Sequence, residues 1–206
     1  MNLPNKITIA RILMIFLFLL ISNTDDMINN LLGENFVRPW KIFGFVIAII
    51  AGLTDFIDGY IARKYNMITD FGRLMDPMAD KIFITTAFIV LVESNILSGW
   101  IAVIILSREF LVTGLRLLAA SKGTIIPADN TGKLKTILQM VFLILGGAIW
   151  TGLISKEDSI LFKSDIKILW ILSLSIIVFI TVFSGITYFV KHRNLFLNLT
   201  KNGEIK

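Results

Sequence analysis

The chain has 206 residues, of which 55% are hydrophobic and 17% are charged, and its mean hydropathy is +0.79. Soluble domains carry about a quarter charged residues, so the composition argues against a soluble domain and against a disordered chain. The absence of cysteine excludes disulfides, thiolate metal sites and a cysteine nucleophile. In so apolar a chain, the net charge of +5 favours a basic face against anionic lipid, and we expect no nucleic-acid partner.

Uncharged apolar runs mark the candidate membrane spans, and a helical span takes about 20 residues. Six runs follow one another, over residues 12–21, 42–53, 82–92, 96–106, 137–154 and 168–190. The fourth continues past Arg108 and Glu109 to residue 118, and only the turn 93–99 separates it from the third. The pattern predicts an all-α integral membrane protein with six transmembrane helices. We expect a single domain over residues 1–206, with a core ending near 195 and a tail over 196–206.

The basic residues orient these spans. Most Lys and Arg residues lie before the first span, in the connections 63–81 and 108–135, and beyond residue 190. Cytoplasmic segments of membrane proteins carry such an excess of positive charge. Both termini and the segments 63–81 and 116–135 are therefore expected in the cytoplasm.

Four aspartates are placed where charge is costly. Asp55 and Asp58 lie three residues apart at the cytoplasmic end of the second span, and Asp76 and Asp80 lie four apart at the start of the third. Each pair shares one face of a helix, and a short connection makes the two helices antiparallel neighbours. Pro77 allows two helix starts, one with Asp76 as the cap and one earlier with a bend. The four carboxylates are expected to converge.

Carboxylates gathered near a membrane repel one another unless cations neutralise them. Hard divalent cations prefer oxygen ligands, and the single His and absent Cys argue against a soft-metal site. The pattern predicts two divalent ions, Mg²⁺ or Mn²⁺, held by Asp55, Asp58, Asp76 and Asp80 in a phosphoryl-transfer centre.

Small and basic residues accompany the aspartates. Gly59 and Ala62 let a planar or phosphate-bearing ligand approach the second helix, and Arg63 is suited to clamp a phosphate. Gly72 lies in the expected connection, where a tight turn or a close phosphate requires it. Asn5, Thr8 and Arg11 follow one another at intervals of three along the first helix. They either reach the edge of the nucleotide or metal site, or they form a helix cap followed by a basic residue that sets the membrane topology.

A second group of charges lies in the fourth and fifth spans. Arg108, Arg116 and Lys135 are suited to hold an acceptor that carries its own phosphate, which a neutral alcohol would not require. Glu109 is expected to orient an arginine. The alternative is that Arg108 and Glu109 form a structural pair within the membrane and that the lysines set topology.

The spacing of eight residues resembles the signature of the CDP-alcohol phosphotransferase family: Asp55, Asp58, Gly59, Ala62, Arg63, Gly72, Asp76 and Asp80. The resemblance implies a six-helix membrane enzyme, usually a homodimer, that displaces CMP from a CDP-activated lipid or alcohol. It also implies that the four aspartates bind two divalent ions and that Asp80 is the general base. Gly59, Ala62, Arg63 and Gly72, with Asn5 and Thr8, would bind the CDP portion of CDP-diacylglycerol.

Three further segments, 2–11, 107–118 and 132–136, resemble the bacterial phosphatidylglycerophosphate synthases. This resemblance implies transfer of the phosphatidyl group from CDP-diacylglycerol to sn-glycerol 3-phosphate in the bacterial inner membrane, with the active site facing the cytoplasm. Arg108, Arg116 and Lys135 would bind the acceptor phosphate. Alternatives are another acceptor (serine, inositol phosphate or phosphatidylglycerol) and, outside the family, a divalent-cation transporter.

Overall fold

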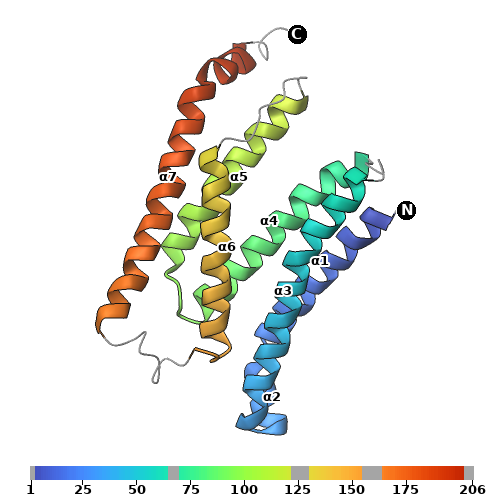
Figure 1. Ribbon diagram of the computed structural model, residues 1–206, viewed down its shortest axis with the longest axis vertical. Coiled ribbons are helices and arrows are strands. Elements are labelled where there is room, and N and C mark those ends of the chain that lie inside the picture. Colours follow the sequence, from blue (N-terminus) through green and yellow to red (C-terminus); the bar gives the residue numbers. More distant parts are fainter. Residues whose placement is uncertain (1–2, 65–69, 122–129, 155–163, 202–206) are drawn as a thin grey trace. The chain divides into compact units, whose positions relative to one another are not determined.

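The computed structural model describes the backbone of residues 3–64, 70–121, 130–154 and 164–201, and its regular structure there is entirely helical. Figure 1 shows the seven helices coloured along the chain. They are α1 (Leu3–Ser22), α2 (Asp25–Leu32), α3 (Glu34–Lys64), α4 (Asp70–Glu93), α5 (Gly99–Ser121), α6 (Asn130–Trp150) and α7 (Ser164–Lys201). The prediction of an all-α protein is confirmed for these residues.

The lengths and compositions of the helices fit a membrane protein. Within the described residues, three segments are long and apolar enough to cross a bilayer: Asn5–Ser22, Glu34–Thr54 and Trp170–Lys191. A shorter apolar helix covers Lys135–Trp150. The helix α2, which the sequence analysis did not predict, has eight residues and is too short to span a bilayer. It lies in the connection between the first and second predicted spans.

The chain divides into two compact units, and the boundary falls within α5 and α6. Unit 1 comprises Met1–Ala102 and Val141–Lys163, and unit 2 comprises Val103–Met140 and Ser164–Lys206. In unit 1, α1 packs against α3 and α4, and α2 packs against α3, as Figure 1 shows.

Close packing in unit 1 depends on aromatic and small residues. The rings of Phe18 and Trp150 meet edge to face with 5.7 Å between their centroids. A Cβ added to Gly147 would lie 2.2 Å from a ring atom of Phe45, so only glycine fits against this ring. Small residues let membrane helices approach closely, and here they join α6 to α3.

Side chains also fix the position of α2. The indole Nε1 of Trp40 donates to Thr24 Oγ1 at 2.9 Å, and Lys41 forms an ion pair with Asp25 at 2.8 Å. Gly33 ends α2 with φ of +92°, a conformation that favours glycine. These contacts order the segment between α1 and α3.

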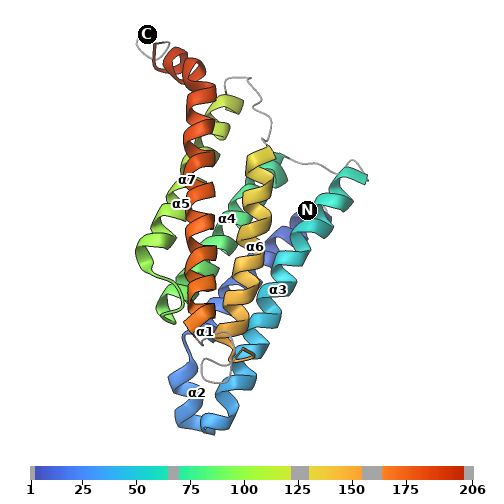
Figure 2. The same ribbon diagram turned by 60° about the vertical axis from the view of Figure 1, so that its left-hand side comes forward.

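Unit 2 contains most of α5, the first half of α6 and all of α7, and α5 and α7 are visible in Figure 2. Its interior mixes apolar residues such as Ile105 with buried polar ones, including Glu109, Lys135, Gln139 and Ser184. Buried polar groups inside a membrane protein mark functional sites by default. The interior of unit 2 is therefore a candidate site in its own right.

Candidate active site

The four aspartates lie on two helices of unit 1 that contact each other. Asp55 and Asp58 belong to α3, and Asp76 and Asp80 belong to α4. The side chains of Asp55 and Asp58 lie outside the described residues, as do those of Gly59, Ala62 and Arg63. Of the predicted acidic set, the geometry of Asp76 and Asp80 is therefore what the structure describes.

Asp76 and Asp80 do not lie at the beginning of their helix. α4 already begins at Asp70 and contains Pro77, so the earlier of the two starts that the sequence allowed is the observed one. Proline lacks an N–H, so the helix loses the bond to the carbonyl of Arg73, while the rest of the helix is retained by packing against α1 and α3. Asp76 and Asp80 are both partly exposed, one helical turn apart.

The prediction that Gly72 lies in a connection is wrong. Gly72 is buried within α4, and the glycines with positive φ among the described residues are Gly33 and Gly152. A tight turn is thus not the reason for glycine at this position. A close approach of a ligand to the helix backbone stays a prediction.

The first helix reaches the acidic residues directly. Thr8 is 1% exposed, and its hydroxyl donates to Asp76 Oδ1 at 2.8 Å. Asn5, one turn earlier, is also buried. Thr8 was expected at the nucleotide or metal edge, and its hydroxyl contacts an aspartate of the predicted metal-binding set. Binding of the nucleotide by Thr8 stays a prediction.

A second contact of α1 lies next to the aspartates of α3. Arg11 is 1% exposed, and its Nε donates to Thr54 Oγ1 at 3.3 Å. Thr54 directly precedes Asp55 in the chain. Only the position of Thr54 next to Asp55 could have drawn attention to it in the sequence.

Carboxylates of α4 fit the chemistry of a divalent cation. Asp76 and Asp80 supply hard oxygen ligands on one face, and Asp80 Oδ2 also lies 3.3 Å from Lys81 Nζ. Among the side chains that the structure describes, no group of three or more His, Cys, Asp or Glu residues gathers. The predicted ligand set also includes Asp55 and Asp58, whose side chains lie outside the described residues, so the metal site stays a prediction.

The predicted acceptor residues lie in unit 2, where the structure brings two of them together. Glu109 Oε1 contacts the Nζ of Lys135 and lies 3.4 Å from Nη1 of Arg108. Lys135 is 2% exposed and Glu109 is 7% exposed, so the pair is buried between α5 and α6. Glu109 was expected to orient an arginine, and its carboxylate in fact contacts two cations, Arg108 and Lys135.

Arg108 and Arg116 both turn towards α7. Arg108 Nη2 donates to Ser184 Oγ at 3.1 Å, and the guanidinium carbon of Arg116 lies 5.5 Å from the ring centroid of Tyr188. The Nε atoms of both arginines are buried and have no hydrogen-bond partner among the described residues. Hydrogen-bonding capacity therefore remains for a ligand.

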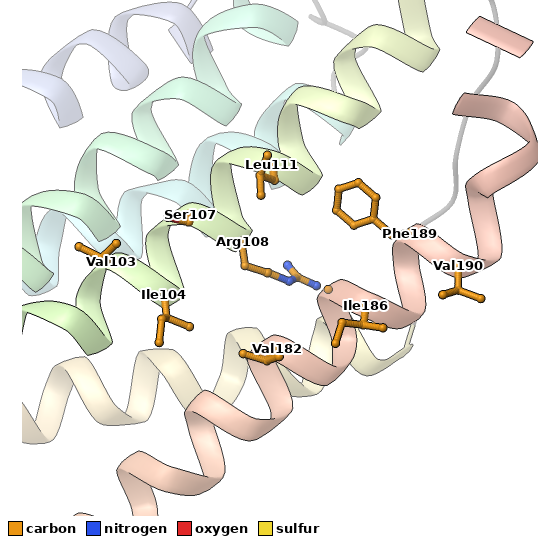
Figure 3. A pocket seen from close by; sticks show the side chains of 10 residues that line it. Val103, Ile104, Ser107, Arg108, Leu111, Val182, Ile186, Phe189 and Val190 are labelled. Atoms are coloured by element: carbon orange, nitrogen blue, oxygen red, sulfur yellow. The ribbon is translucent and has the colours of Figure 1, made fainter. Parts of the chain in front are cut away.

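A groove of about 480 Å³ lies beside Arg108 on the faces of α5 and α7, as Figure 3 shows. Its lining is apolar except for Ser107 and Arg108, and includes Val103, Val182 and Phe189. In Figure 3 the Arg108 side chain extends from α5 towards α7.

Sequence reasoning missed the α7 residues, Ser184, Gly185 and Tyr188. The available signal was polar residues at helical spacing within an apolar span, since Thr181, Ser184 and Tyr188 recur at intervals of three and four. Hydroxyls and glycines are common in membrane helices, so this signal alone did not select a site.

Comparison with known proteins agrees with the acidic motif. The sequence model of the CDP-alcohol phosphatidyltransferase family matches residues 1–185. The chain is similar to proteins named CDP-diacylglycerol–glycerol-3-phosphate 3-phosphatidyltransferase from two bacteria. The one from Bacillus subtilis (strain 168) is 37% identical over 93% of this chain and 95% of the relative. The one from Rickettsia typhi (strain ATCC VR-144 / Wilmington) is 38% identical over 91% and 95%.

The likeness covers both units, because the family match extends from α1 to the middle of α7. It therefore includes the aspartates of unit 1 and the buried charges of unit 2. An enzyme also accounts better than a cation transporter for acids joined to a motif of small and basic residues. The chain belongs to the CDP-alcohol phosphatidyltransferase family and is an enzyme of the phosphatidyltransferase class.

Proposed function

We propose that this enzyme transfers the phosphatidyl group from CDP-diacylglycerol to sn-glycerol 3-phosphate, forming phosphatidylglycerophosphate and CMP in phospholipid biosynthesis. The observation that carries the choice of acceptor is a group of charges in unit 2, in which Glu109 and Lys135 are buried and Arg108 and Arg116 are half-buried. Among the side chains that the structure describes, three cations and one carboxylate gather here, and their net positive charge suits a phosphate-bearing acceptor. Serine or another acceptor without a phosphate would leave this charge uncompensated.

Unit 1 provides the donor side in this proposal. Asp55, Asp58, Asp76 and Asp80 would hold two divalent cations, Mg²⁺ or Mn²⁺, which when bound neutralise the pyrophosphate and the charge on departing CMP. The CDP portion would bind to residues from α1, α3 and α4: Asn5, Thr8, Gly59, Ala62, Arg63 and Gly72. Thr8 donates to Asp76 and so holds this carboxylate in one orientation.

In the reaction, Asp80 takes the proton from the 1-hydroxyl of glycerol 3-phosphate. The hydroxyl oxygen then forms a bond to the phosphorus that carries diacylglycerol, and the bond from this phosphorus to the oxygen of CMP breaks. Arg108, Arg116 and Lys135 would hold the acceptor phosphate and so restrict the orientation of the acceptor. Direct displacement requires no covalent intermediate on the protein.

The membrane arrangement that we propose assigns one span to each helix except α2. The six spans would be α1, α3, α4, α5, α6 and α7, in a single domain with both termini and the active site on the cytoplasmic side of the bacterial inner membrane. The distribution of Lys and Arg supports this orientation. We also propose a homodimer, by resemblance to the family.

An acceptor panel tests this function. The purified protein, in detergent with CDP-diacylglycerol and Mg²⁺, is given labelled glycerol 3-phosphate, serine, inositol phosphate or phosphatidylglycerol in turn, and lipid product and CMP are measured. Of the four acceptors, we expect only glycerol 3-phosphate to give product. A chelator that removes the divalent cation should stop product formation until Mg²⁺ or Mn²⁺ is restored. Faster product formation with any other acceptor would refute the proposal.

A further inference from the structure

We propose that α7 positions the two acceptor arginines through Ser184, Gly185 and Tyr188, and thereby determines the affinity for the acceptor phosphate. This inference rests on the proposed function, because it requires Arg108 and Arg116 to hold that phosphate. The three residues lie on one face of α7, within one turn of one another, and all belong to unit 2 together with the arginines.

Ser184 is the hydrogen-bond acceptor for Arg108. Its hydroxyl donates to the carbonyl of Thr181 at 3.0 Å, which fixes the direction of the O–H bond. A lone pair of the same oxygen then accepts from Arg108 Nη2 at 3.1 Å. Ser184 is 3% exposed, so water does not compete for this oxygen, and the guanidinium is held in one orientation.

Gly185 makes room for the same arginine. A Cβ at this position would lie 3.1 Å from Arg108 Cγ, closer than a carbon normally comes to another carbon. The absence of a side chain therefore lets the stem of Arg108 lie against the α7 backbone, in the arrangement that Figure 3 shows. A methyl group would displace the stem and move the guanidinium away from Ser184.

Tyr188 holds the second arginine one turn further along α7. Its ring is 4% exposed and lies 5.5 Å from the guanidinium carbon of Arg116, within the range of a cation–π contact. The two arginines, two turns apart on α5, are thus matched by two contacts one turn apart on α7.

The neutrality of these partners is what distinguishes a binding site from a structural ion pair. Residues 168–190 of α7 contain no charged side chain. A hydroxyl and an aromatic ring orient a guanidinium without cancelling its charge, whereas a carboxylate on α7 would cancel it. Among the described side chains, α7 therefore adds no carboxylate to that of Glu109, which Arg108 already shares with Lys135, and positive charge is left over for an acceptor phosphate. In this inference α7 is a positioning element without contact to the reacting atoms.

The test separates binding of the acceptor from binding of the donor. Ser184→Ala and Gly185→Ala are compared with wild type for kcat and for the KM of glycerol 3-phosphate and of CDP-diacylglycerol. We expect each to raise the KM for glycerol 3-phosphate about 3- to 10-fold, as loss of one hydrogen bond does, with the KM for CDP-diacylglycerol unchanged. Ser184→Thr keeps the hydroxyl and should stay closer to wild type than Ser184→Ala.

Matched controls come from the same two helices. A Cβ added to Gly114 of α5 meets nothing within 4 Å, so Gly114→Ala reports the effect of removing a helical glycine without a clash. Ser175 of α7 is exposed and its hydroxyl donates to the carbonyl of Ile171, so Ser175→Ala reports the loss of a hydroxyl away from the arginines. Both controls should retain wild-type values of KM.

A double variant identifies the route of the effect. If Ser184 acts through Arg108, then Arg108→Ala combined with Ser184→Ala should have the same KM for glycerol 3-phosphate as Arg108→Ala alone. Additive effects, an unchanged KM in Ser184→Ala, or equal rises in both KM values would overturn the inference. Wild type that does not use glycerol 3-phosphate would instead overturn the proposed function.

Discussion

The acidic region of unit 1, with Asp76 and Asp80, and the basic region of unit 2, with Arg108, Arg116 and Lys135, differ in the exposure of their charged side chains and in the groups that orient them. The side chain of Asp80 is 33% exposed, whereas that of Lys135 is 2% exposed. In the acidic region a neutral hydroxyl, that of Thr8, orients a carboxylate. In the basic region a carboxylate is shared between two cations, and neutral groups of α7 orient the two arginines.

The difference follows from what each region is proposed to bind. Divalent cations exchange with solvent and require carboxylate oxygens that are accessible, so partial exposure suits Asp76 and Asp80. An acceptor phosphate is held more strongly by cations that are shielded from water, which suits the burial of Lys135 and the half-buried position of the two arginines. Loss of charge should therefore abolish turnover in the first region and weaken acceptor binding in the second.

The largest effect is expected in the acidic region. Asp80→Asn removes the proposed base and a metal ligand with almost no change in shape, so kcat should fall about 10³-fold or more. CMP release with saturating CDP-diacylglycerol and glycerol 3-phosphate measures it. Asp26→Asn, on the exposed surface of α2, is the matched control and should keep wild-type turnover. Near-normal turnover of Asp80→Asn would remove the base assignment.

A smaller effect is expected from the buried pair of unit 2. Lys135→Met keeps the volume but removes a charge, so the KM for glycerol 3-phosphate should rise about 100-fold through loss of a charged hydrogen bond to phosphate. The thermal midpoint of the purified protein should also fall, because Glu109 loses one of its cations inside the protein.

Removing both charges of this pair distinguishes binding from structure. The double variant Glu109→Gln/Lys135→Met leaves no uncompensated carboxylate, so we expect its thermal midpoint to recover towards that of wild type. Its KM for glycerol 3-phosphate should stay high, because the phosphate ligand is still missing. Recovery of the KM together with stability would show that Lys135 only neutralises Glu109.

The smallest of these effects concerns the hydroxyl that contacts Asp76. Thr8→Ala should raise the Mg²⁺ concentration for half-maximal activity about 10-fold, as loss of a group that orients a metal ligand does. Thr8→Ser retains the hydroxyl and should behave like wild type. An unchanged Mg²⁺ requirement, with a raised KM for CDP-diacylglycerol, would return Thr8 to the nucleotide-binding role first predicted for it.

Much of the secondary structure was predictable from the apolar runs. Each of the six runs lies within one helix, apart from the first residues of the fourth run (96–98) and the last of the fifth (151–154), because an uncharged run of this length satisfies its backbone only as a helix in a membrane. The short helix α2 was not predictable, since its residues are polar and its position depends on Trp40 and Lys41 of α3. The sequence did not decide where α4 begins, because Pro77 is compatible both with a start at Asp76 and with an earlier start.

The candidate site, too, was predictable from the sequence only in part. Spacing along one helix predicted that Asp76 and Asp80 share a face. It also placed Glu109 beside an arginine, although the second partner, Lys135, came from another helix. Spacing misplaced Gly72 in a connection, because the chain between the two motif halves is partly helical.

The sequence by itself determined the membrane class, the helices, the acidic motif and the family, because these depend on composition and on short-range spacing. Only the tertiary structure decided which neutral groups meet the charges: Thr8 at Asp76 and, on α7, Ser184 at Arg108 and Tyr188 at Arg116. Helical periodicity fixes which residues share a face, but not which helix that face meets. Since a hydroxyl or a ring makes no charge pattern in the sequence, these partners become visible only when the helices pack.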